Sequence, residues 1–150
     1  KKKTPGWCKS LNTKGCDCIL LVHDKDRNNA ANLRDQLEAI LRDAPQTKKV
    51  VAIPEEELEA WLLSDAEAIN KALKLDGKFK AVHHPEGVAS PKGYLRDAVY
   101  KVSEKKKSYV NNVHNKIIAE QIDTAKIALL CPSFTPFMEL FAKKVKTRKA

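Results

Sequence analysis

The chain has 150 residues, 43% of them hydrophobic and 31% charged, and a formal net charge of +9 at pH 7. These values are typical of a soluble globular protein with one domain and a single core. No apolar run approaches the ~20 residues of a membrane helix, and no apolar segment follows the lysine-rich start. We therefore expect a cytoplasmic protein with no membrane partner and no secretory signal.

A strand, a helix and a second strand are predicted in the first third of the chain. The first strand, at 16–23, contains the run Cys-Ile-Leu-Leu-Val, whose lack of polar alternation is typical of a strand buried on both faces of a parallel sheet. An amphipathic helix with asparagine caps is predicted over 29–43, and a short apolar strand over 50–53. Such a unit predicts parallel strands joined by a right-handed crossover.

Helices are predicted for most of the remaining chain. Pro54 suits the first turn of a helix, and the glutamates at 55–57 suit its positive end. Residues 1–15 are predicted to be a flexible lead-in, and 143–150 a basic tail. Further helices are predicted at 64–80 with a break at Asp76-Gly77, at 94–107, at 111–130 and from Ser133 onward.

Two carboxylates, Asp24 and Asp26, follow the first predicted strand. The carboxyl ends of strands are where open α/β sheets bind ligands. Because Mg²⁺ takes oxygen ligands, often one or two carboxylates with substrate phosphate, this pair predicts a metal site facing a phosphate-bearing substrate. The pattern also fits a pair that caps the next helix, or a phosphatase acting on small phosphoesters. Asp-x-Asp alone does not distinguish these readings.

Glu59 and a lysine triplet are further candidates. Glu59 borders the apolar stripe of its predicted helix, beside Trp61, although a surface glutamate paired with a lysine fits the same position. The net charge favours a polyanionic partner. Lys105, Lys106 and Lys107 stand near Tyr109, where they fit either phosphate contacts or an exposed helix end.

The four cysteines predict reduced, buried thiols. Cys16 and Cys18 point to opposite faces of a strand, so both cannot readily bind one ion. A zinc site using Cys8, Cys16 and His23 is a weaker alternative, because the spacing matches no common zinc pattern.

Several segments together resemble Toprim-related proteins, in particular small Toprim-like proteins from prokaryotic anti-phage defence gene clusters that often stand beside an ATPase partner. The resemblance covers roughly residues 16 to 142 and is carried by DKD, IPEEELEAWLLSD, SPKGYL and IIAEQIDTAKIALLCPSF. It implies an α/β, Rossmann-like three-layer sandwich with a small, mainly parallel sheet and a helix-rich second half.

The resemblance also implies Mg²⁺- or Mn²⁺-dependent cleavage of nucleic-acid phosphodiesters. It assigns Asp24 and Asp26 as metal ligands, Glu59 as the acidic residue of the E-x-W segment that assists catalysis as a ligand or base, and Lys116 as a catalytic cation. Toprim catalysis also uses a glutamate after an earlier strand, and no acidic residue precedes the first strand here. We therefore expect that the family's first strand is missing and that a two-metal centre lacks one ligand.

The sequence thus leaves two functions open. The first is a Toprim-type nuclease in a defence or nucleic-acid-processing system. The second is a catalytically incomplete module of the same fold that docks on an ATPase partner or on nucleic acid. Whether the protein forms a homo-oligomer, and whether the nucleic acid is DNA or RNA, is not decided by the sequence.

Overall fold

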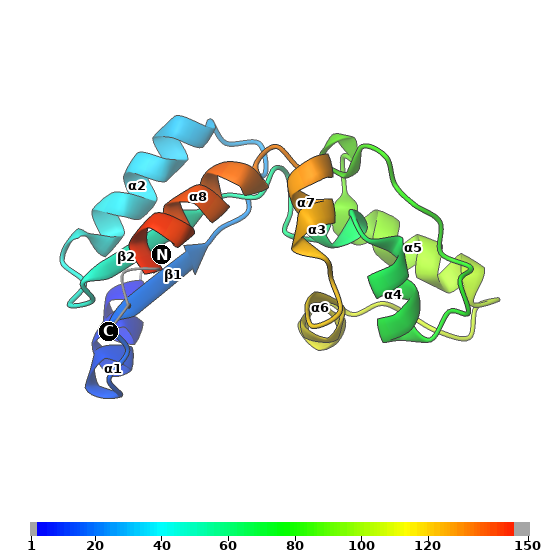
Figure 1. Ribbon diagram of the computed structural model, residues 1–150, viewed down its shortest axis with the longest axis horizontal. Helices are drawn as coiled ribbons and strands as arrows, with labels where there is room; N and C mark the ends of the chain where they lie inside the picture. Colours follow the sequence, from blue (N-terminus) through cyan, green and yellow to red (C-terminus); the bar gives the residue numbers. More distant parts are fainter. Residues whose placement is uncertain (1–2, 146–150) are drawn as a thin grey trace. The chain divides into compact units, whose positions relative to one another are not determined.

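The computed structural model describes residues 3–145, with only the backbone for Val145 (Figure 1). Although one domain was expected, the chain divides into two compact units, each with its own hydrophobic core. We call them the sheet unit (Lys1–Ile53 and Thr135–Ala150) and the helical unit (Pro54–Phe134). Residues 146–150 of the predicted basic tail lie outside the described residues.

The sheet unit contains the predicted strand–helix–strand segment. β1 (Cys18–Val22) and β2 (Lys48–Ala52) pair in parallel, with Cys18 opposite Lys48 and Val22 opposite Ala52. The helix α2 (Ala30–Arg42) connects them and is capped by the Asn29 side chain, which accepts a hydrogen bond from the Asn32 N–H at 3.1 Å. The parallel pairing predicted from the sequence is therefore confirmed.

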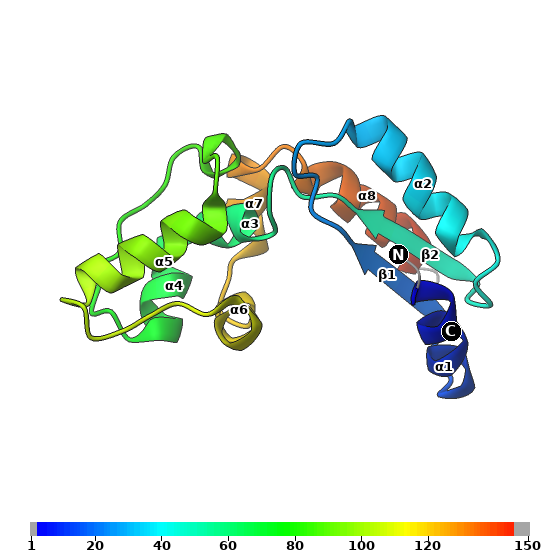
Figure 2. The same cartoon turned by 180° about the vertical axis from the view of Figure 1, so that it is seen from behind.

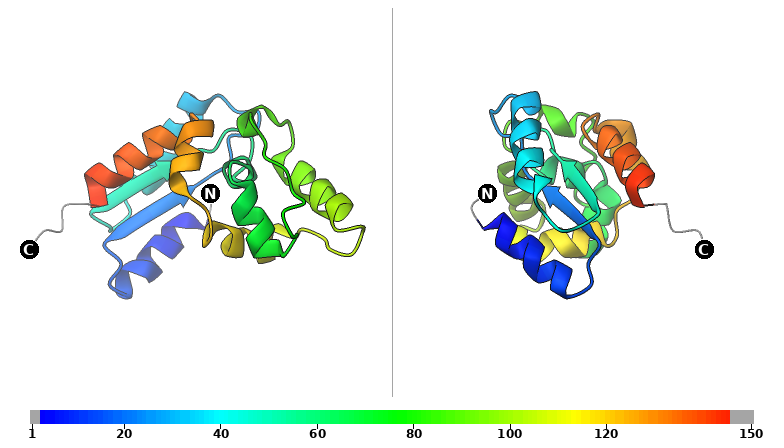
Figure 3. Two further views of the ribbon diagram at one scale, coloured as in Figure 1. Left: turned by 45° about the vertical axis from the view of Figure 1, so that its right-hand side comes forward. Right: turned by 90° about the vertical axis from the view of Figure 1, so that its left-hand side faces the viewer.

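Helices cover both faces of this small sheet. α1 (Thr4–Thr13) and α2 lie on one face and α8 (Phe134–Val145) on the other (Figures 2 and 3). The prediction of a flexible lead-in at 1–15 is wrong for α1, because Pro5 suits its first turn and Cys8 is fully buried in the sheet unit's core. That core contains Cys8, Ile19, Leu33, Leu37, Leu41, Val51 and Ile53.

The prediction that β1 is buried on both faces is also wrong. Leu20 and Val22 are 42% and 41% exposed, whereas Val50 and Ala52 of β2 are fully buried. The described sheet has two strands, so both are edge strands, and the exposure of Leu20 and Val22 shows that this face of β1 is left largely uncovered. An apolar run therefore does not by itself indicate how many strands surround it.

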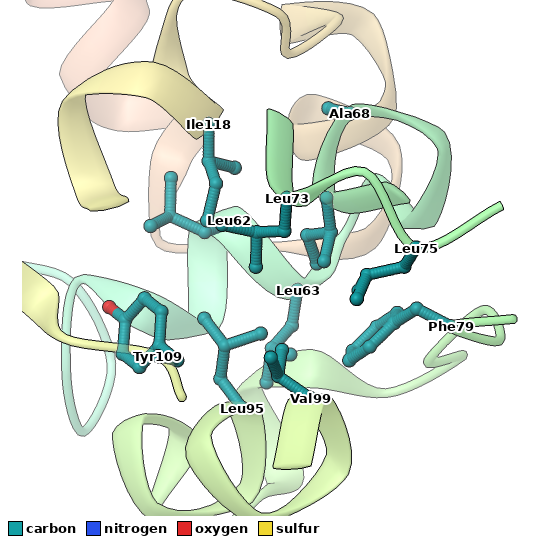
Figure 4. Packing of buried hydrophobic residues seen from close by; sticks show 11 residues of the cluster. Leu62, Leu63, Ala68, Leu73, Leu75, Phe79, Leu95, Val99, Tyr109 and Ile118 are labelled. Atoms are coloured by element: carbon teal, nitrogen blue, oxygen red, sulfur yellow. The ribbon is translucent and has the colours of Figure 1, made fainter. Parts of the chain in front are cut away.

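The helical unit consists of short helices around a second core (Figure 4). Leu62 and Leu63 contribute to this core together with Leu95 and Val99, all at most 4% exposed. The elements are α3 (Glu59–Leu63), α4 (Ala66–Leu73), η1 (Pro85–Gly87), α5 (Pro91–Val102), α6 (Asn111–Ala119) and α7 (Thr124–Leu130).

Two helices of this unit differ from those predicted from the sequence. The helix expected from Pro54 begins only at Glu59, since Glu56 has a left-handed backbone (φ 56°) and Glu57 accepts a hydrogen bond from the Lys92 N–H at 2.7 Å. The helix expected over 111–130 is divided into α6 and α7, because Asp123 caps a new helix there.

The chain is thus a mixed α/β protein with a small parallel sheet and a helix-rich second half, as predicted. No helix in the part of the chain that the structure describes is long and apolar enough to cross a membrane.

Leu63→Ala tests the helical core. Leu63 is fully buried, so we expect its truncation to lower the free energy of unfolding by about 2–5 kcal/mol. The matched control is Leu129→Ala on α7, where the leucine is 81% exposed and a change within about 0.5 kcal/mol is expected. Urea denaturation measures both variants. Equal losses for the two would contradict this assignment of the core.

Candidate functional site

Asp24 and Asp26 lie beyond the carboxyl end of β1, in the sheet unit. The Asp24 residue is half-buried and Asp26 is exposed. Asp26 has a left-handed backbone conformation, φ 49°, which is uncommon outside glycine although aspartate tolerates it better than most residues. The N-cap residue of α2 is Asn29, whose side chain accepts a hydrogen bond from the Asn32 N–H.

His23 extends the β1–β2 pairing by one step. Its N–H donates to the Ala52 carbonyl oxygen at 3.1 Å, and its ring Nδ1 lies 2.7 Å from the Asp24 carbonyl oxygen. A carbonyl can only accept, so Nδ1 carries the hydrogen and Nε2 of the neutral ring is an acceptor. A half-buried histidine therefore stands next to Asp24, with its Nδ1 facing the Asp24 carbonyl oxygen.

Glu59 is the most deeply buried of the predicted site residues. It is 2% exposed, in the first turn of α3. Its Oε1 accepts hydrogen bonds from the Tyr109 hydroxyl at 3.0 Å and from the Asn115 Nδ2 at 3.1 Å. The same hydroxyl also contacts the Asn115 Oδ1, so the three side chains form one buried polar cluster.

The cluster shifts the ionisation of Tyr109. Burial raises the pKa of its phenol well above the ordinary value, and the nearby negative charge of Glu59 raises this pKa further. Tyr109 is thus a neutral hydrogen-bond donor throughout the physiological range. It lies at the edge of the helical core, next to Leu95 (Figure 4).

The predicted lysines have different surroundings. Lys116 has an 83% exposed side chain and lies 3.8 Å from Glu120, one turn along α6. Lys106 pairs with Glu104 at 3.0 Å, and Lys105 is exposed. Lys107 instead donates to the carbonyl oxygens of Leu73 and Lys74 at the end of α4 (2.9 and 2.5 Å), which is a structural contact.

A second buried carboxylate, Asp65, joins two segments that lie far apart in the sequence. Its Oδ1 accepts from the N–H groups of Glu67 and Ala68 and so caps α4. Its Oδ2 accepts from the Asp123 N–H at 3.0 Å, and Lys126 donates to Oδ1 at 2.9 Å. Burial alone would raise the pKa of Asp65, but these hydrogen bonds outweigh it and hold the pKa below its ordinary value.

Ser133 connects its own segment to two others of the helical unit, the one that contains Glu55 and Trp61 and the one that contains Glu86. Its hydroxyl accepts from the Trp61 Nε1–H at 2.8 Å and from the Glu55 N–H at 3.3 Å, and it contacts the Glu86 carboxylate. The Ser133 N–H donates to the same carboxylate at 3.1 Å. The segments ELEAW and CPSF are therefore held together by hydrogen bonds, and these contacts account for a serine and a tryptophan at these positions.

The described residues do not form a complete metal cage. Within residues 3–145, no three His, Cys, Asp or Glu side chains gather as metal ligands, and this includes the zinc alternative of Cys8, Cys16 and His23. Asp24 and Asp26 belong to the sheet unit, whereas Glu59 and Lys116 belong to the helical unit.

These features define a basic α/β protein with an aspartate pair at the carboxyl end of a parallel strand. The chain belongs to the DUF4276 family, a domain of unknown function whose model matches residues 1–141. No curated protein and no solved structure matches the chain. The matched range includes the whole helical unit and all of the sheet unit except residues 142–150.

Sequence reasoning did not identify Tyr109 and Asn115 as partners of Glu59. Asn115 stands next to the predicted Lys116, and its side chain, not that of Lys116, contacts Glu59. Tyr109 was noted only as a neighbour of the lysine triplet. No spacing rule connects these residues, because 50 positions separate Glu59 from Tyr109.

Asp65→Asn tests the buried ion pair with Lys126. Asparagine keeps a capping oxygen but loses the charge, so we expect the free energy of unfolding near pH 7 to fall by about 1–3 kcal/mol. Because folding lowers the pKa of Asp65, its contribution is complete above the ordinary carboxyl value of about 4 and is lost as the pH falls through the folded-state pKa. Urea denaturation across this range should show the difference between wild type and variant shrinking in acid.

The control for that measurement is Asp97→Asn, an exposed aspartate paired with Arg96. It should change stability by no more than about 0.5 kcal/mol at any pH. The assigned charge effect would be contradicted if the wild type and Asp65→Asn differed in unfolding free energy by the same amount in acid as near pH 7.

A double-mutant cycle tests the cluster of Glu59 and Tyr109. Tyr109→Phe removes the donor from a buried carboxylate, so a loss of about 1–3 kcal/mol in unfolding free energy is expected. Combined with Glu59→Gln, the losses should be non-additive by at least about 0.5 kcal/mol, since the residues share one hydrogen bond. Strict additivity would show that the two side chains do not interact. Tyr100→Phe, an exposed tyrosine, is the matched control.

Proposed function

We propose that this protein binds nucleic acid and cleaves its phosphodiester bonds with Mg²⁺ or Mn²⁺. The observation that carries the proposal is the aspartate pair directly after a parallel strand, with an accessible Asp26 in a left-handed conformation. Residues in rare backbone conformations gather at functional sites. The resemblance to Toprim-related proteins supports the same chemistry and further suggests a role in a prokaryotic defence or nucleic-acid-processing system.

The donors present fit one hard divalent cation. Asp24 and Asp26 supply carboxylate oxygens, and Mg²⁺ is commonly held by one or two carboxylates with water and substrate phosphate as the remaining ligands. Neither soft sulfur nor a third carboxylate is required for such a site. The bound ion would neutralise charge on the phosphate and lower the pKa of a bound water.

The chain's own residues then have separate tasks. Asp24 and Asp26 would hold the cation, and the formal charge of +9 would draw in the polyanionic substrate. His23, with Nε2 as acceptor, is suited to take a proton near the aspartate pair. The catalytic roles of Glu59 and Lys116 stay part of the proposal, with Glu59 held in place by Tyr109 and Asn115.

The second candidate is a module of this fold that docks on nucleic acid or an ATPase partner without catalysis. The observation that favours it is the burial of Glu59, whose Oε1 already accepts two hydrogen bonds within the helical unit. A carboxylate held in this way fits a structural role as well as a catalytic one.

Asp24→Asn combined with Asp26→Asn tests the nuclease proposal in the full chain. We expect Mg²⁺-dependent cleavage of plasmid DNA or labelled RNA to fall by at least about a hundredfold, because both proposed ligands lose their charge. Mg²⁺ should also raise the melting midpoint of the wild type by mass action and leave that of the double variant unchanged.

Asp35→Asn is the control, since Asp35 is an exposed aspartate on α2 of the same unit. It should cleave as the wild type does. Cleavage that survives in the double variant overturns the metal assignment. Nucleic-acid binding without cleavage or metal-induced stabilisation supports the docking module, whereas turnover of a generic aryl phosphate alone supports a phosphatase.

A further inference from the structure

A group of lysines surrounds the C-terminal end of α4 in the helical unit. Three neighbouring hollows open there, and Lys74 lines all of them. The first, of about 160 Å³, is lined by Lys74, Lys78 and Lys106 with Asp76 and Glu104. The lysines come from two loops, one after α4 and one after α5, so the fold and not a single run of sequence brings them together.

Lys107 explains why the two loops stay together. Its Nζ donates to the carbonyl oxygens of Leu73 and Lys74, and the last carbonyl groups of a helix have no partner within the helix itself. A cation at this position also offsets the negative end of the α4 dipole. Lys107 therefore supplies the hydrogen bonds and the positive charge that the end of α4 requires. This requirement does not account for Lys74, Lys78 and Lys106.

Glu104 orients two of the remaining lysines. It pairs with Lys78 at 3.4 Å and with Lys106 at 3.0 Å. Hydrogen bonds from Lys106 and then from Lys78 lower the pKa of Glu104, so it stays ionised. Lys74, in contrast, has no ion-pair partner among residues 3–145 and holds an exposed position in a left-handed backbone conformation (φ 53°).

We infer that the lysine face made by Lys74, Lys78 and Lys106 around these hollows, with the exposed Lys105 next to Lys106 in the loop after α5, binds consecutive phosphate groups of a nucleic-acid backbone. Lys71 lines the second hollow and extends the face along α4. Lysines from separate loops around adjoining hollows suit a ligand that carries several phosphates, and such contacts position a polymer without reading its bases. Lys107 acts as a positioning residue that holds the α5 loop against α4.

The inference rests on the proposed function only in its choice of nucleic acid as ligand. It revises the sequence-based choice of residues, because Lys107 is committed to backbone contacts and Lys74 and Lys78 are added. It also separates binding from cleavage. The aspartate pair lies in the sheet unit and the lysine face in the helical unit, so each can be altered alone.

Fluorescence anisotropy with a labelled DNA duplex and a labelled single strand, in EDTA and over a range of salt, tests the inference in the full chain. Lys74→Gln with Lys106→Gln should weaken binding about tenfold and reduce the slope of log K against log salt by about 1.4–1.8, because each phosphate contact contributes about 0.7–0.9. Lys78→Gln with Lys105→Gln should act in the same way and serves as an independent second variant.

Lys9→Gln with Lys14→Gln is the matched control. Both lysines are exposed in the sheet unit, and neither lines any of the three hollows. This variant should bind with nearly the wild-type slope. An equal loss in control and test variants would show a diffuse charge effect and overturn the inference, as would unchanged binding in both test variants.

Competition distinguishes the source of the phosphate. Inorganic phosphate or ATP at the same phosphate concentration should displace the labelled strand poorly, and equal displacement would overturn the choice of a polymer.

Asp24→Asn with Asp26→Asn should bind as the wild type does. If this variant loses cleavage while the lysine variants bind normally, the inference fails and the nuclease proposal stands. If the lysine variants lose binding and the wild type shows no cleavage, the inference about the lysine face stands and the nuclease proposal fails.

Discussion

The buried carboxylate of Asp65 is the interaction on which the helical unit most depends. One side chain caps α4, accepts the Asp123 N–H and pairs with Lys126. It therefore joins α3 and α4 to the start of α7, across 58 positions of sequence. A charge at 3% exposure is tolerated only because backbone N–H groups and a lysine replace the water that it loses.

The same principle accounts for the other buried polar groups of this unit. Glu59 is satisfied by Tyr109 and Asn115, and Ser133 by Trp61 and Glu86. These residues lie in or pack against the segments IPEEELEAWLLSD and IIAEQIDTAKIALLCPSF. Much of the distinctive sequence of the chain thus specifies how short helices pack, since each buried polar group admits few arrangements.

The chemistry we propose is divided between the two units. The aspartate pair is positioned by the parallel pairing of β1 with β2, which carries the chain to the end of the strand with His23 still hydrogen-bonded to Ala52. The lysine face is positioned by Lys107 at the end of α4. One arrangement depends on a sheet and the other on a helix terminus, and each uses backbone groups to place charged side chains.

The sequence by itself determined the local elements: the two parallel strands, α2 with its asparagine cap, α8 and the positions of the aspartate pair. Hydrophobic periodicity and capping residues act over a few positions, so they are readable without the fold. The sequence did not predict the exposure of β1, the presence of a helix at 4–13 or the division between α6 and α7. Burial and helix ends depend on what packs against them. Only the tertiary structure decided that Asn115 and not Lys116 contacts Glu59, and that Lys107 donates to carbonyl oxygens at the end of α4, since partners distant in sequence meet only when the chain folds.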